Sequence, residues 1–187
     1  MKEVLVDRDC GVRPQTTLES LGKLKPVFVK DGSGTTTAGN SSQITDGAAV
    51  ILLTRRDIAV KLGSKIYGRI LSFAVAGVPP KIMGIGPAFA IPAALKKAGL
   101  KTDDIDIFEI NEAFASQAAY CVKQLGVPKE KLNPRGGAIA LGHPLGMTGA
   151  RMIVTLFSEL ERTKQKRGVV SMCIGTGMGA CGVFERE

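Results

Sequence analysis

The sequence contains no tryptophan, two tyrosines, one histidine and four cysteines in 187 residues. The cysteines form no CxxC pair, and one histidine cannot complete the common zinc-ligand sets. Metal sites and disulfides are therefore not expected, and free thiols indicate a reducing compartment. No apolar run reaches the ~18 residues that a membrane span requires, and the charged first eight residues are unlike a signal peptide. We expect a soluble, unsecreted protein without membrane insertion.

Positive charge is in excess, with a formal net charge of +8 at pH 7. Such a balance would suit nucleic acid or a phosphorylated small molecule as partner. The lysines and arginines are spread along the chain, however, and residues that could stack on bases are scarce. Nucleic acid is therefore not expected as a partner.

Short apolar runs alternate with helical patterns along the chain, which predicts an α/β fold. Residues 1–40 lack sustained periodicity and are interpreted as a loop. The run at residues 48–53 is typical of a strand buried on both faces. Further strands are expected at residues 65–78, 105–110, 169–174 and 180–185, and helices at residues 55–62, 87–98, 114–125 and 149–162.

The expected helix at residues 149–162 has an unusually wide apolar face. At 100° per residue its apolar side chains cover roughly 200°, against the ~100° of an ordinary surface helix. We expect this helix to be buried on two sides. The other elements are mostly committed to one sheet, so the second covering layer is expected to be missing.

His143, the sole histidine, lies in a glycine-rich turn between Gly142 and Gly146. A core histidine bonded to a carbonyl is the plain alternative. Pro144 disfavours helical angles at residue 143, so the imidazole is expected at a helix entrance. There it could act as a base or donate a hydrogen bond to an oxyanion.

Cys173 ends an apolar strand pattern and is followed closely by Gly175. A buried, inert thiol is the usual role of such a cysteine. Near an imidazole its pKa could instead fall below the free value of about 8.5, which would allow it to transfer a proton. Cys10, Cys121 and Cys181 lack such surroundings and are interpreted as structural.

Asn111 is expected at a strand-to-helix junction, where an N-cap is its plainest role. Glu112 beside it would suit the positive end of the helix. The segment from Gly175 to Ala180 formally fits the GxGxxA dinucleotide fingerprint. No helix is expected after it, so nucleotide binding is not inferred.

Three segments of the chain together resemble the C-terminal signatures of the thiolases; they are Asn111-Glu112-Ala113-Phe114-Ala115, the glycine-rich stretch at residues 137–151 and the ending at residues 173–179. Residues 36–42 and 46–49 resemble the thiolase segment that precedes them, and residues 83–87 are most similar to the peroxisomal 3-ketoacyl-CoA members. The resemblance implies the C-terminal half of a thiolase-like fold, with a mixed sheet and helices on both faces. Residues 1–62 would be the end of the loop region and the last strand and helix of the N-terminal domain, and residues 63–187 the C-terminal domain.

The resemblance also implies roles for individual residues. His143 would activate a nucleophilic cysteine and help to bind the thioester oxygen, and Asn111 would hold a water of that oxyanion site. Cys173 would be the acid/base, and the N–H of Gly175 would belong to a second oxyanion site. The pantetheine and acyl pocket would be lined by Ser42, Met83 and Phe114.

The family's nucleophilic cysteine lies in the N-terminal half, near the start of a central helix, and no segment of this chain resembles its motif. The parent enzyme is expected to cleave a 3-ketoacyl-CoA with CoA to acetyl-CoA and a shortened acyl-CoA, in fatty acid β-oxidation. This chain alone is expected to be inactive. The alternative is a non-catalytic isoform that binds CoA or pairs with subunits, and a cysteine hydrolase using Cys173 and His143 is disfavoured because no orienting carboxylate is evident.

The expected partners are CoA and acyl-CoA as substrates, the N-terminal thiolase half and, in the full-length enzyme, a second subunit of a homodimer. No cofactor is expected. The resemblance implies a peroxisomal location, although the family's targeting signal is not present in this chain; otherwise the protein would be cytoplasmic.

Overall fold

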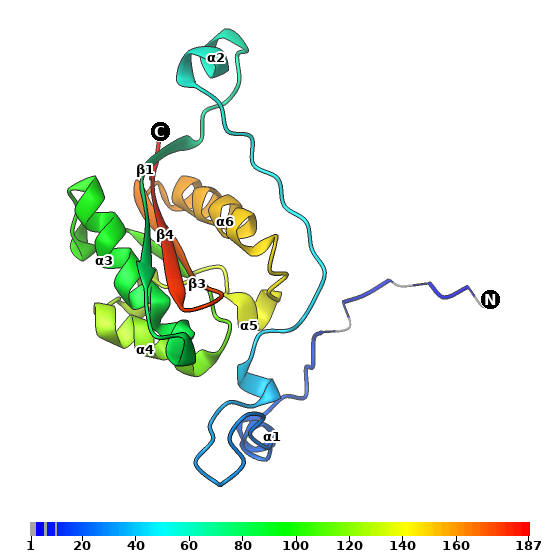
Figure 1. The fold of residues 1–187 in the computed structure, drawn as a ribbon. Coiled ribbons are helices and arrows are strands. Elements are labelled where there is room, and N and C mark those ends of the chain that lie inside the picture. Colours follow the sequence, from blue (N-terminus) through cyan, green and yellow to red (C-terminus); the bar gives the residue numbers. More distant parts are fainter. Residues whose placement is uncertain (1–2, 6, 10) are drawn as a thin grey trace. The chain divides into compact units, whose positions relative to one another are not determined.

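A mixed four-stranded sheet organises the chain from residue 40 onward, in the order β1-β4-β3-β2 (Figure 1). Its strands are β1 (Gly68–Gly77), β2 (Ile107–Ile110), β3 (Arg167–Ile174) and β4 (Met178–Arg186). β4 pairs antiparallel with both β1 and β3, whereas β2 pairs parallel with β3. A parallel pair needs a long crossover, and here that crossover carries the glycine-rich stretch at residues 137–151.

The structure is a computed structural model that describes residues 3–5, 7–9 and 11–187, so Cys10 lies outside the described residues. It separates into two units, residues 1–39 and 40–187. In the first unit a short helix, α1 (Leu18–Gly22), corrects the loop expected for residues 1–40. It forms because Thr17 Oγ1 accepts from Ser20 N while Ser20 Oγ accepts from Thr17 N, which completes a capping box. The 3-10 turn η1 (Ala38–Asn40) follows.

Helices cover both faces of the sheet, as the α/β expectation required (Figure 1). On one face lie α3 (Gly86–Ala98) and α4 (Ala115–Leu125), and on the other lies α6 (Thr148–Thr163). The remaining elements are short; they are α2 (Arg56–Lys61), α5 (Ala138–Leu141) and the 3-10 turns η2 (Pro80–Ile85), η3 (Thr102–Asp104) and η4 (Lys129–Lys131).

Each face of the sheet has its own hydrophobic core. Phe108 and Ile110 of β2 pack with Ile91 of α3 on one side, and all three are fully buried. On the other side, Leu156 of α6 packs with Ile107 and Val170. Burying side chains of this size stabilises the fold by about 1.5–3 kcal/mol each.

α3 approaches β4 through two glycines, Gly86 and Gly179. A Cβ atom on Gly179 would lie 2.2 Å from the carbonyl carbon of Gly86, and one on Gly86 would lie 2.6 Å from Gly179 Cα. No side chain fits at either position without a backbone shift. The close approach lets the start of α3 rest directly on the sheet.

Most elements agree with the expectations from local pattern. α3 ends at Ala98 before Gly99, which has a φ of 69°, and α6 covers the expected residues with one extra residue at each end. β1 begins at Gly68, three residues later than expected. No helix in the described part of the chain is long and apolar enough to cross a membrane.

The strand expected at residues 48–53 is wrong. This segment is extended but joins no sheet, and Val50 and Leu52 are 89% and 81% exposed. A strand exists only where a neighbouring backbone pairs with it, and within the described residues no strand lies beside this run. The helix expected after it is present as α2.

α6 is buried on one side only. Met152, Leu156 and Leu160 are fully buried against the sheet, whereas Val154 is 50% exposed and Ile153 is half-buried. The second covering layer expected from the wide apolar face is not supplied by the described residues.

Candidate active site

Asn111 and His143 come from separate loops and meet beside the carboxyl end of β2. The Nδ2 atom of Asn111 lies 3.3 Å from His143 Nε2. Asn111 is 1% exposed, and its Oδ1 atom is buried without a hydrogen-bond partner. A buried acceptor of this kind costs free energy unless a water or ligand donates to it. The structure thus brings two of the expected site residues together.

Asn111 does not cap the following helix, which corrects the plainest expectation for it. The N-cap of α4 is Phe114, because residues 111–113 form a loop before the helix begins. Gln117 of α4 connects the helix to this loop. Its Nε2 donates to the Asn111 carbonyl at 3.2 Å, and its Oε1 accepts from Phe114 N at 3.3 Å.

The second ring nitrogen of His143 contacts Thr148, the first residue of α6. The distance from Nδ1 to Thr148 Oγ1 is 2.7 Å, and the same hydroxyl donates to the Pro144 carbonyl at 2.9 Å. Burial lowers the pKa of His143, and the charge of Arg151 lowers it further. The imidazole is therefore neutral at pH 7, which is the form that can accept a proton.

Ser42 lies between the two loops that carry Asn111 and His143. Its backbone N–H donates to the carbonyl of Ala113 at 2.9 Å, and the neighbouring Gln43 carbonyl accepts from His143 N at 3.2 Å. The segment at residues 42–43 therefore ties both loops together. Phe114 is at the same junction, where it forms an isolated β-bridge with Ser41.

Glu112 organises the turn that leads to His143. Its two carboxylate oxygens accept from Asn133 Nδ2 at 2.8 Å and from Ile139 N, at the start of α5, at 3.3 Å. A Cβ atom on Gly137 would lie 2.0 Å from the Glu112 carboxyl carbon, so glycine leaves the room that the carboxylate needs. Glu112 thus accepts from a backbone N–H at the start of α5, whereas it had been expected to interact with the start of α4.

Arg151 and Glu109 lie behind this site. The distance from Arg151 Nη1 to Glu109 Oε2 is 3.4 Å, and the Glu109 side chain is 1% exposed. Burial raises the pKa of Glu109 to about 7, although Arg151 opposes the rise. The other carboxylate oxygen, Oε1, has no hydrogen-bond partner.

Cys173 lies at the carboxyl end of β3, the strand next to β2. The alternation of side chains along β2 and β3 places Cys173 on the face covered by α3 and Asn111 on the face covered by α6. Both residues nevertheless lie at the carboxyl ends of their strands, at the same end of the sheet. No hydrogen bond among the described residues joins Cys173 to His143. The β3–β4 turn follows, with Gly175 as its first residue.

The pKa of Cys173 contradicts the expectation of an acidified thiol. Burial raises this pKa, since no cation close to the thiol offsets the loss of water. Burial also raises the pKa of Cys121, to which the neighbouring Cys173 adds a smaller effect. Cys173 is consequently a thiol at pH 7, able to donate a proton.

Met83 is in η2, beside α4. The carbonyl of its neighbour Gly84 accepts from Cys121 Sγ at 3.6 Å, and a Cβ on Gly84 would contact Gln117. Met83 is half-buried, and its neighbour Gly84 lies against Gln117, whose Nε2 donates to the Asn111 carbonyl. Of the expected binding residues, Ser42 and Phe114 thus lie at the loop after β2, and Met83 lies in a turn that packs on α4.

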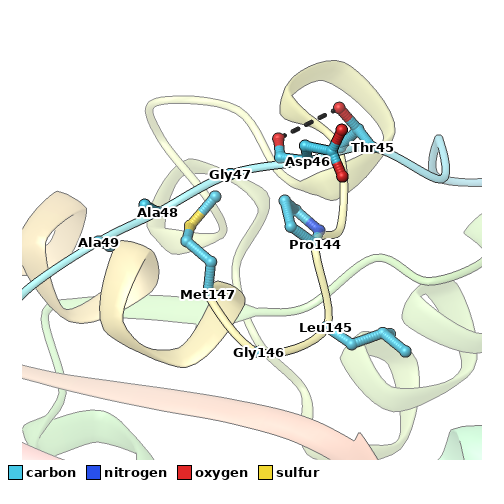
Figure 2. A pocket seen from close by; sticks show the side chains of 9 residues that line it. All are labelled: Thr45, Asp46, Gly47, Ala48, Ala49, Pro144, Leu145, Gly146 and Met147. Atoms are coloured by element: carbon cyan, nitrogen blue, oxygen red, sulfur yellow. Dashed lines mark hydrogen bonds between the residues drawn. The ribbon is translucent and has the colours of Figure 1, made fainter.

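A shallow cavity of about 380 Å³ begins one residue after His143. Figure 2 shows its walls, the segment from Thr45 to Ala49 and the loop from Pro144 to Met147. The Met147 side chain reaches toward Gly47 across the opening (Figure 2). None of the residues expected to bind acyl-CoA lines this cavity.

Sequence reasoning missed Thr148, Gln117 and Arg151. Thr148 sits five residues after His143, and a hydroxyl at this spacing before a helical pattern was the available signal. Gln117 and Arg151 carry no local signal, because their contacts depend on how the helices pack. Among the described residues no group of three or more potential ligands could hold a metal ion.

Comparisons with known proteins agree with this fold. The family described as the thiolase C-terminal domain matches residues 64–186, and the thiolase N-terminal domain family matches residues 1–57. The peroxisomal 3-ketoacyl-CoA thiolase B of Rattus norvegicus is 69% identical over 98% of this chain, and the human peroxisomal 3-ketoacyl-CoA thiolase is 66% identical over 98%. The chain spans 43% of the length of each relative.

Solved structures give the same result. The dimeric peroxisomal thiolase of Saccharomyces cerevisiae superposes with a TM-score of 0.89 at 57% identity, over 97% of this chain and 46% of the yeast chain. The Bacillus anthracis acetyl-CoA acetyltransferase gives 0.92 at 45% identity, over all of this chain and 47% of the other. The thiolase-like fold is confirmed, and the peroxisomal location agrees with the names of the relatives. Matched along its length by both domain families, this chain is a member of the thiolase family.

Proposed function

We propose that this chain supplies the acid/base and oxyanion-binding groups of a 3-ketoacyl-CoA thiolase of fatty acid β-oxidation. The observation that carries the proposal is the pairing of a neutral imidazole with a buried amide whose oxygen is unpartnered, at the end of β2. The names of the relatives support the substrate class. Peroxisomal location and assembly as a homodimer are part of the same proposal.

In the first half-reaction, His143 Nε2 takes the proton of a cysteine thiol contributed by the other thiolase half. The thiolate attacks the 3-keto carbon. His143 and a water held by Asn111 bind the thioester oxygen, which takes up negative charge as the bond to carbon 2 breaks. The bond between carbons 2 and 3 then breaks, and its electron pair remains on carbon 2. Cys173 donates its proton to that carbon, and acetyl-CoA leaves.

In the second half-reaction, the Cys173 thiolate takes the proton of an incoming CoA thiol. The CoA thiolate attacks the acyl-cysteine, and the Gly175 N–H contributes to the second oxyanion site. The nucleophilic cysteine leaves as a thiolate and regains its proton from His143, so a shortened acyl-CoA is released. The directions of the pKa shifts suit these roles, because His143 begins as a base and Cys173 begins as an acid.

Ser42, Met83 and Phe114 are proposed to line the pantetheine and acyl pocket. Ser42 joins the two loops of the site. Phe114 is the N-cap of α4, and Met83 lies in η2, which packs against α4. No cofactor is required by this chemistry, since CoA and acyl-CoA are themselves the substrates.

A chimera tests the proposal. Residues 1–187 would replace the matched part of the yeast peroxisomal thiolase, and CoA-dependent cleavage of acetoacetyl-CoA would be measured. We expect turnover that falls by roughly 10²–10⁴-fold in His143→Ala or Cys173→Ser. Cys181→Ala is the matched control, because Cys181 is buried in the core. A folded, dimeric chimera without turnover would refute the proposal.

The alternative is a non-catalytic chain that binds CoA or pairs with other subunits. The half-exposed outer side of α6, with Val154 at 50%, favours a subunit-binding role. The isolated chain is expected to show no thiolase turnover in either case. An inactive chimera that still binds CoA or full-length subunits would favour this alternative.

A further inference from the structure

Thr148 lies on the side of His143 that faces away from Asn111. It is the first residue of α6, is fully buried and touches both His143 and Pro144. None of the roles described above uses its hydroxyl. Its position next to the base of the site nevertheless restricts what the imidazole can do.

The hydrogen-bond directions around Thr148 leave little freedom. A hydroxyl has a single hydrogen, and that of Thr148 is donated to the Pro144 carbonyl at 2.9 Å. Toward His143, 2.7 Å away, Thr148 Oγ1 can then only accept. With this hydroxyl direction, the proton of the neutral imidazole is on Nδ1.

The contact on the opposite side of the ring requires the same arrangement. Asn111 Nδ2 is a donor and lies 3.3 Å from His143 Nε2. With the proton on Nε2, two donors would face each other at this position. With the proton on Nδ1, each contact from Asn111 through the ring to Pro144 joins one donor to one acceptor.

We infer that Thr148 is a positioning residue that fixes His143 in the tautomer carrying its proton on Nδ1, so that Nε2 has the lone pair that can accept a proton. Threonine suits this task because its branched side chain is stiff and its hydroxyl is held by the carbonyl four residues earlier. The importance of the tautomer for catalysis rests on the proposed function. The tautomer itself does not.

The sole histidine makes the inference directly measurable. In ¹⁵N-labelled chain with an affinity tag other than polyhistidine, the imidazole nitrogens give a single set of signals whose shifts report the tautomer. At pH 8, where the ring is neutral, we expect a protonated Nδ1 and an unprotonated Nε2. A predominant Nε2–H form in the wild-type chain would overturn the inference by itself.

Variants separate the hydroxyl from the shape of the side chain. Thr148→Val should shift the tautomer ratio toward Nε2–H by roughly two- to tenfold, the effect of losing one hydrogen bond. Thr148→Ser should keep the wild-type tautomer, and so should Thr155→Val, a change of the same kind elsewhere on α6. A folded Thr148→Val chain with the wild-type tautomer ratio would contradict the inference. If the Thr148→Val variant does not fold, the same measurement is made on Thr148→Ala.

The pH titration gives a second readout. The hydrogen bond to Thr148 Oγ1 also stabilises the imidazolium, so Thr148→Val should lower the pKa of His143 further while Thr148→Ser restores it. An unchanged titration in Thr148→Val would count against a hydrogen bond at this position. Neither readout needs turnover, so an inactive chimera with a fixed tautomer would refute the proposed function and leave this inference intact.

Discussion

Glu109 on β2 and Arg151 on α6 form an ion pair inside the protein, with 3.4 Å between the guanidinium Nη1 and the carboxylate Oε2. Arg151 does not fully compensate the burial of the Glu109 carboxylate, because the Oε1 atom of Glu109 has no hydrogen-bond partner. Arg151 also lowers the pKa of His143. The pair therefore links the interior of the sheet to the electrostatics of the site.

This pair predicts an unusual dependence of stability on pH. The pKa of Glu109 is raised to about 7 in the folded chain, mainly by burial, so between pH 4.5 and 7 the folded state holds more protons than the unfolded state. The stability contributed by Glu109 is thus full below its unfolded pKa and is lost as the pH rises toward 7. The loss amounts to about 3 kcal/mol.

Glu109→Gln tests this dependence, since glutamine has the same shape and does not titrate. The free energy of unfolding of both chains would be measured in urea from pH 4.5 to 8. Relative to the variant, the wild type should lose about 3 kcal/mol of unfolding free energy between pH 4.5 and 7, and above pH 7 the difference between the two should stay constant. The lowered pKa of His143 has the opposite effect on stability, but it is common to both chains. A difference that stays constant with pH would contradict the prediction.

The two sides of α6 predict different costs of truncation. Leu156→Ala removes a fully buried side chain from the core against the sheet and should cost about 2–5 kcal/mol of unfolding free energy. Val154→Ala, two residues away and 50% exposed, should change it by no more than about 0.5 kcal/mol. Equal losses in urea unfolding would mean that both sides are covered.

The contact between Gly86 and Gly179 predicts a sensitive position next to a tolerant one. Gly179→Ala would force its Cβ against the backbone of α3, at a cost of about 1–3 kcal/mol or more. Gly175→Ala is the control, because no heavy atom lies within 4 Å of the added Cβ. Its melting temperature should equal that of the wild type, and a matching drop in both variants would show that the glycine contact is not the cause.

Burial of the thiols predicts their order of reactivity. Cys181 is 1% exposed and burial raises its pKa to about 12, whereas Cys173 is only half-buried, although burial raises its pKa as well. In native chain at pH 7, iodoacetamide should modify Cys173 more slowly than a free cysteine and should leave Cys181 unmodified. Peptide mass spectrometry measures each site, and a Cys173 that reacts faster than a free thiol would restore the idea of an acidified sulfur.

Local signals were enough to predict the longer helices, whereas the short helices α1 and α5 were not expected. The start of α3 at Gly86 and its end before Gly99 depend on residues within the segment itself, and the apolar face of α6 is visible from its spacing. The strand expected at residues 48–53 failed because a strand depends on a partner elsewhere in the chain. An apolar run alone does not supply one.

The same distinction applies to the site. The glycine-rich turns single out His143 and Cys173 as candidates for chemistry, but the pKa of Cys173 depends on packing around the end of β3 that no local pattern describes. Asn111 was expected as a cap because the loop of three residues before α4 leaves no mark in the sequence. Its contact with His143 joins residues 32 positions apart, and only the fold brings them together.

β1 is an edge strand of the sheet, and this position affects how the chain associates with itself. Within the described residues its second side pairs with no strand, and Phe73 and Val75 are 58% and 49% exposed. An apolar strand with free main-chain groups invites pairing with another copy of itself. At high concentration, copies of this chain should therefore pair with one another through β1. Val75→Lys should suppress this self-association.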